Sequence, residues 1–163
     1  MLLEAIQALY EHNHIATERV LDTAEKLTNE QWLAPQTAGR GSIRDTLVHL
    51  VSGMRSWLAS WKGETGQGQP NPEEYPDVAA VRQLFRTVNV ASQGYLKGLT
   101  DNDLGRVITR KRQDGSEMSA PMWQMMLHVT NHGMQHRSEV AAMLTAFGHS
   151  PGELDLLRLL PQR

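Results

Sequence analysis

The sequence of 163 residues contains no cysteine. The absence of thiols excludes a disulfide framework, a cysteine nucleophile and every thiolate metal site, and it suits a reducing compartment. The fold must therefore depend on a hydrophobic core, which a chain of this length can build as one domain. We expect a single-domain, cytoplasmic protein over residues 1–163.

Long apolar stretches are also missing. No segment approaches the roughly 20 apolar residues that a membrane-spanning helix requires. The N-terminal residues carry acidic Glu4 and Glu11 early and lack the cationic start of a secretory signal. We expect neither a membrane span nor an export signal.

The chain has no surplus of basic charge. Sixteen Lys and Arg residues oppose eighteen Asp and Glu residues, which gives a formal net charge of −2. Nucleic-acid binding needs basic side chains clustered on one face, whereas here they are scattered apart from a short run at residues 110–112. We expect no nucleic-acid partner.

Apolar side chains recur at helical spacing along four segments. The pattern predicts long helices over residues 2–27, 42–62, 76–99 and 119–147. Ser42 suits an N-cap, and Gly148 suits the left-handed residue that follows the end of a helix. Four amphipathic helices of this length predict an all-α fold, a four-helix bundle.

A segment of different character precedes the last helix. Residues 106–118 combine β-branched side chains with a central Asp114-Gly115, which is a strong hairpin turn signal. Residues 63–75 hold three glycines and two prolines and predict a surface loop. The tail after Gly148 has an apolar cluster that we expect to pack back on the bundle.

Three histidines lie in one run within the last predicted helix. His128, His132 and His136 follow one another at four-residue steps, which separate neighbours by about 40° around a helix and about 6 Å along it. The eight-residue step from His128 to His136 is about 12 Å along the axis. Those two side chains cannot share an ion through bonds of about 2.0–2.1 Å, so a metal-binding pair must include His132.

The apolar stripe of that helix favours His132 with His136. The inward face carries Met125, Val129, Val140 and Met143. His132 and His136 lie within the same arc, and His128 lies about 60° to its side. A single buried histidine is most simply a hydrogen-bonded core residue, but two at i, i+4 on an apolar face favour metal binding.

A third ligand must come from another helix. His49 is the one histidine in the second predicted helix, and it lies on a flank of small and polar residues that includes Thr46, Ser52 and Gly53. Periodicity leaves two interpretations open: a solvent-facing histidine, or a ligand at the base of a cleft that keeps one coordination position open. His12 and His14 are expected to be ordinary surface or edge residues.

Two segments of the sequence resemble the DinB-like family, also called DinB/YfiT-like. They are SIRDTLVH in the second helix and LHVTNHGMQHR in the last, and the likeness covers essentially the whole chain. It implies a small bacterial four-helix bundle with a hairpin before the last helix. It also implies one divalent metal ion, zinc or nickel, bound by a histidine of the second helix and the i, i+4 pair of the last. His49, His132 and His136 are then the ligands.

The sequence departs from the family pattern directly after these ligands. The family often continues H-R-G-Q, whereas Ser138 and Glu139 follow Arg137 here. Glu139 could accept a hydrogen bond near the cleft or stand in solvent, and we expect the latter.

The resemblance implies more than one class of function. Members of the wider superfamily activate a low-molecular-weight thiol at the metal, so the first hypothesis is a metal-dependent thiol S-transferase of the detoxification type with a small-molecule substrate. Metal-assisted hydrolysis is a second enzymatic hypothesis, although no clear general base accompanies the histidines. The non-enzymatic alternative is a metal-binding or stress-associated bundle without turnover, expected as a homodimer.

Overall fold

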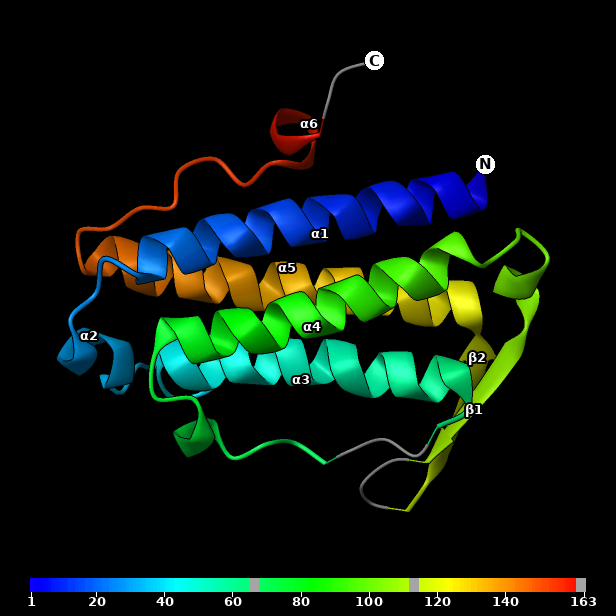
Figure 1. The fold of residues 1–163 in the computed structure, drawn as a ribbon, viewed down its shortest axis with the longest axis horizontal. Coiled ribbons are helices and arrows are strands. Elements are labelled where there is room, and N and C mark those ends of the chain that lie inside the picture. The colour runs from blue at the N-terminus through cyan, green and yellow to red at the C-terminus, as the bar shows by residue number, and fades with distance from the viewer. Residues whose placement is uncertain (65–67, 112–114, 161–163) are drawn as a thin grey trace.

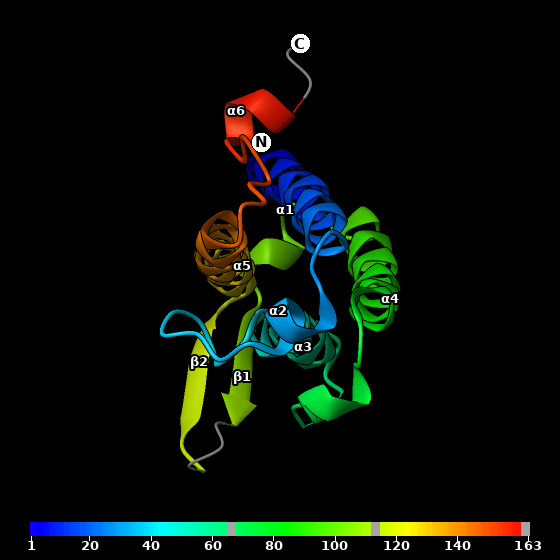
Figure 2. The same ribbon diagram turned by 90° about the vertical axis from the view of Figure 1, so that its left-hand side faces the viewer.

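A computed structural model of the chain describes residues 1–64, 68–111 and 115–160. Its long helices are α1 (Leu2–Ala24), α3 (Ile43–Lys62), α4 (Val78–Lys97) and α5 (Met122–Ala146). They run side by side along the long axis (Figure 1), and seen nearly end-on they occupy the corners of a bundle (Figure 2). The prediction of a mainly helical four-helix bundle is confirmed.

Shorter elements join and flank these helices. They are α2 (Asn29–Leu33), η1 (Pro72–Glu74), η2 (Asp103–Gly105), β1 (Val107–Lys111), β2 (Glu117–Pro121) and α6 (Leu156–Leu159). The two strands form an antiparallel hairpin before α5, with Thr109 opposite Ser119. The predicted hairpin is confirmed, although Asp114 of its expected turn lies outside the described residues.

The ends of the helices differ in part from the sequence-based expectation. The last helix begins at Met122 rather than residue 119, because residues up to Pro121 pair with β1 and proline has no N–H to donate. The third begins at Val78, where Asp77 caps it through its side chain. The N-cap at Ser42 and the left-handed Gly148 (φ 85°) are as predicted.

The core fills the space between the four long helices. Each contributes large side chains that are almost completely buried, among them Tyr10, Leu47, Phe85 and Met126. The tail runs back along α1, and Leu154 packs against the core, as expected from its apolar cluster. Within the described residues no helix combines the length and the apolarity needed to cross a lipid bilayer.

Candidate metal centre

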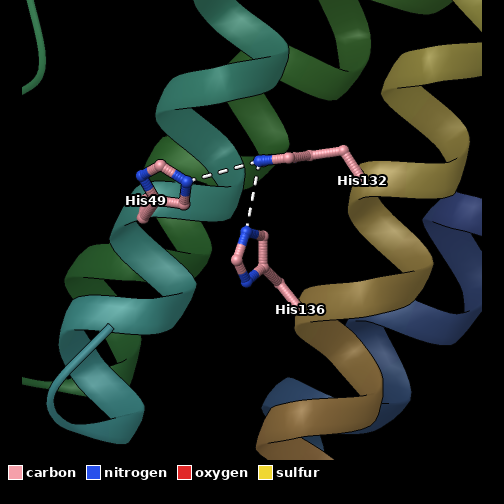
Figure 3. A group of neighbouring side chains, drawn as sticks. All are labelled: His49, His132 and His136. Carbon is pink, nitrogen blue, oxygen red and sulfur yellow. Dashed lines mark hydrogen bonds between the residues drawn. The ribbon is translucent and has the colours of Figure 1, made fainter. Parts of the chain in front are cut away.

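Three histidine rings converge where α3 faces α5. His49 projects from α3, and His132 and His136 project from α5, so that the rings point toward one another across the gap between the helices (Figure 3). Nε2 of His132 lies 3.3 Å from Nε2 of His49 and 3.2 Å from Nε2 of His136. One nitrogen from each ring lies within 4.8 Å of the other two, and this group could hold a metal ion.

The spacing of the three rings fits a divalent metal ion. Four ligands at about 2.0–2.1 Å in tetrahedral geometry lie about 3.3 Å from one another, close to the two Nε2–Nε2 distances at His132. A neutral imidazole has one N–H and one lone pair, so three converging nitrogens cannot all be satisfied by hydrogen bonds among themselves. An ion that accepts all three lone pairs satisfies them.

Small residues on α3 make room for this arrangement. A Cβ atom at Gly53 would lie 3.1 Å from Cε1 of His132, closer than ordinary van der Waals contact. The glycine therefore lets the His132 ring lie directly against α3, one turn along from His49. The flank of small side chains identified in the sequence has this physical consequence.

Glu139 holds the His136 ring from the side away from the cluster. Its Oε2 accepts the Nδ1–H of His136 at 2.6 Å, which leaves the Nε2 lone pair directed at the other histidines. Burial alone would raise the pKa of Glu139, but hydrogen bonds from Gln135 and His136 outweigh it and hold the pKa below its usual value. The expectation that Glu139 stands in solvent was wrong, because the i, i+3 spacing on the helix brings it onto His136.

His49 has a hydrogen-bond partner outside the cluster as well. The side-chain amide of Gln69 lies beside its Nδ1, with Nε2 at 3.1 Å and Oε1 at 3.3 Å. If this oxygen accepts the Nδ1–H, the lone pair of Nε2 faces His132. Sequence analysis missed Gln69, because it lies in the loop after α3, twenty residues from His49, and has no local pattern that marks it.

Burial disfavours the charged form of two of the three rings, those of His132 and His49. Burial lowers the pKa of His132 to about 4, and the neighbouring rings of His136 and His49 add to the effect. The pKa of His49 also lies below its usual value, again chiefly because burial disfavours the charged ring. Neutral imidazole is the form that binds metal, so His132 and His49 have little proton to release when a metal binds at pH 7.

One side of the centre is open. His49 is only half-buried and lines a cleft of about 370 Å³, together with Arg40, Arg44, Gln69 and Glu73 among others. His136, in contrast, is only 5% exposed. The cleft reaches the cluster at His49, whereas neither His132 nor His136 lines it.

The other histidines lie outside the cluster. His128 is exposed and packs against Trp57, with its ring centroid 6.0 Å from that of His132. His12 was expected at the surface or an edge, but it is only 8% exposed because the tail covers it and the carbonyl oxygen of Leu154 lies 2.9 Å from its Nε2. His14 is half-buried and stacks on Phe85.

Removing the carboxylate of Glu139 is expected to weaken metal binding by about 10- to 100-fold, the usual effect of losing the outer partner of a histidine ligand. The variant Glu139→Ala leaves His136 free to rotate and to change tautomer. Competition with a chromophoric chelator measures the affinity. Gln135→Ala is the matched control, since it removes a partner of Glu139 but keeps the hydrogen bond between Glu139 and His136. Equal metal affinity of Glu139→Ala and the wild type would contradict the prediction.

Comparison with known proteins places the chain in a family. The model of the DinB family matches residues 1–162. The chain is 22% identical over 155 residues to Protein DinB of Bacillus subtilis (strain 168), covering 90% of this chain and 88% of that protein. A crystal structure of a DinB-like protein from Bacillus cereus ATCC 10987 superposes with a TM-score of 0.63 at 19% identity, covering 86% of this chain and 91% of the other. The chain belongs to the DinB family.

Proposed function

We propose that the protein binds one divalent metal ion, zinc or nickel, through His49, His132 and His136 and acts as a metal-dependent thiol S-transferase. The observation that carries the proposal is the convergence of three Nε2 atoms at 3.2 and 3.3 Å beside an open cleft. Catalytic zinc sites have three protein ligands and one open coordination position, whereas structural zinc sites have four protein ligands.

The chain's own residues supply the ligand geometry and the access. A divalent ion bound there lowers the pKa of a coordinated thiol and so makes the nucleophilic thiolate available at neutral pH. Glu139 fixes the His136 ring, and the half-buried His49 borders the side from which a thiol and an electrophile can enter.

The hydrolytic alternative has less support from the arrangement. Activation of water for hydrolysis is aided by a free general base close to the metal. Glu139 is the carboxylate bonded to the cluster, and its Oε2 is occupied by the Nδ1–H of His136. A thiol bound to the metal would be deprotonated outright, whereas metal-bound water would have a pKa of about 7. The thiol therefore depends less on a general base, which favours transfer over hydrolysis.

A conjugation assay tests the transferase. Purified protein loaded with zinc or nickel is incubated with a panel of bacterial low-molecular-weight thiols and monochlorobimane. In the reaction a carbon–sulfur bond forms, the carbon–chlorine bond breaks, chloride leaves with the bonding electron pair, and the thiol proton passes to the buffer. We expect conjugate to form faster with the loaded protein than with chelator-treated protein or with His132→Ala.

The same assay separates catalysis from metal binding alone. Protein with stoichiometric metal and native circular dichroism that consumes no thiol above the background would contradict the transferase. The family membership and the histidine cluster would then be explained by the non-enzymatic alternative, a bundle that binds metal without turnover.

A further inference from the structure

Arg40 borders the metal centre with an unpaired charge. It lines the same cleft as His49. Among the arginines in the described ranges, the side chains of Arg40 and Arg158 are the ones that neither donate a hydrogen bond nor form an ion pair with a described residue. Arg158 lies on α6, on the far side of α1 from the cleft (Figure 1). Arg40 is therefore the free cation next to the histidines.

The backbone fixes the position of Arg40. Its N–H donates to Oγ1 of the fully buried Thr46 at 2.9 Å, and it is flanked by glycines with left-handed φ angles, 70° at Gly39 and 117° at Gly41. A Cβ atom at Gly39 would lie 2.5 Å from Thr46 Oγ1 and 2.6 Å from the methyl carbon of Met143. The turn is thus packed tightly onto α3 and α5, and it presents Arg40 to the cleft from a preorganised backbone.

The other charged residues of the cleft are Arg44, Asp45 and Glu73. Arg44 donates to the neighbouring Asp45 at 3.0 Å. Glu73 keeps its negative charge, since among the described residues its side chain accepts only from the neutral amide of Asn71 and forms no ion pair with Arg40. Arg40 and His49 line this cleft together, so the guanidinium borders the candidate metal centre. An anionic group entering the cleft meets, in Arg40, a guanidinium group that forms no ion pair with a described residue.

We propose that Arg40 binds a carboxylate of the thiol substrate, so that the protein selects low-molecular-weight thiols that carry a carboxylate over neutral ones. The inference rests on the proposed function, since it takes the metal centre as the site of the thiol sulfur. A guanidinium group matches a carboxylate with two parallel N–H donors, which makes arginine suited to this selection. Arg40 is a specificity-determining residue in this proposal.

The size of the effect follows from the exposure of the side chain. Arg40 is exposed, and exposed ion pairs contribute up to about 1 kcal/mol, which corresponds to about fivefold in affinity. Such an interaction weakens as ionic strength rises. We expect an approximately fivefold preference that depends on Arg40 at low salt and falls toward unity at high salt.

Thiol binding to the cobalt(II)-loaded protein tests the proposal without turnover. The thiolate-to-cobalt charge-transfer band reports binding, and the ligands are a series of mercapto acids of increasing chain length, each paired with its methyl ester. In Arg40→Gln the affinity for the best-binding acid is expected to fall about fivefold, while the affinity for its ester stays the same. Arg40→Lys is expected to retain part of the preference for the acid. Arg158→Gln removes the same charge far from the cleft and is expected to retain the full preference.

The outcomes distinguish this inference from the proposed function. If acids and esters both bind and Arg40→Gln changes neither or both equally, the role of Arg40 is wrong and the thiol site stands. If cobalt binds stoichiometrically but no thiol produces the band, the thiol site is wrong and the inference falls with it. A loss specific to the acid that diminishes with added salt supports both.

Discussion

Replacing His132 with alanine is expected to abolish metal binding, from near-stoichiometric metal in the wild type to almost none in the variant. His132 is the central ring of the cluster, since its Nε2 lies 3.3 Å from Nε2 of His49 and 3.2 Å from Nε2 of His136. Without it, two imidazoles on different helices remain, and two protein ligands do not hold a structural or catalytic zinc ion stably. Elemental analysis after desalting measures the metal content directly.

Two further variants make this result specific. His128→Ala removes an imidazole from the same helix one turn away, but His128 is exposed and outside the cluster, so its metal content is expected to equal that of the wild type. Circular dichroism confirms that each variant is helical. Equal metal in His132→Ala and wild type would refute the assignment, and full retention in His49→Ala alone would mean that another residue is the third ligand.

The helix pair could be recognised from the sequence because its geometry is local. The four-residue step between His132 and His136 and the apolar arc around them are properties of one helix, and a helix has fixed rise and rotation. The structure brings these two rings together as the spacing indicates, with Nε2 atoms 3.2 Å apart. The spacing excluded only the pair of His128 with His136, and the apolar arc then favoured His136 over His128 as the partner of His132.

The position of His49 depends on how α3 packs against α5, which periodicity does not encode. Its flank of small residues is equally compatible with solvent and with a close helix–helix approach, and only the resemblance to the DinB-like family selected it. In the structure His49 does lie beside His132. The absence of a Cβ atom at Gly53 permits this, because it lets the His132 ring lie against α3. Gln69 and Arg40 reach the site from loops, where no period exists to place them.

The start of α5 illustrates a second limit. Residues 119–121 resemble a helix start, because they lie directly before a long helical pattern. The structure places them in β2, where Ser119 pairs with Thr109 ten residues earlier. Pairing across a hairpin is a tertiary contact, and it overrides local propensity.

The buried cation of Arg137, next to His136, forms no ion pair with a carboxylate of the described residues. Arg137, which follows His136, is only 3% exposed. Its Nη1 donates to the side-chain oxygen of the equally buried Asn13 on α1 and, at 3.4 Å, to Oγ1 of Thr17. Burial lowers the pKa of Arg137 to about 10, still far above neutral pH, so α5 and α1 are joined through a charged group that depends on neutral acceptors.

Replacing Asn13 with leucine is therefore expected to destabilise the protein by about 3 kcal/mol, since hydrogen bonds to a charged group contribute about 1.5–3 kcal/mol and a stranded buried charge costs more. The change keeps the number and branching of the side-chain heavy atoms, so that no cavity is left and the acceptor is lost. Urea denaturation of the metal-free protein measures the free energy of unfolding without a contribution from bound metal. Thr17→Val, which removes the longer contact, is expected to cost less than about 1 kcal/mol.

The double variant Asn13→Leu/Arg137→Met shows whether the stranded charge is the cause. Methionine removes the cation, and apolar replacements of a buried polar pair are often nearly neutral. The double variant should thus be more stable than Asn13→Leu alone, with a coupling free energy of about 2 kcal/mol or more in the mutant cycle. Strictly additive losses would refute the coupling. Gly133 makes room for this polar pair, because a Cβ atom there would lie 2.5 Å from Oδ1 of Asn13 and 2.8 Å from Nη1 of Arg137.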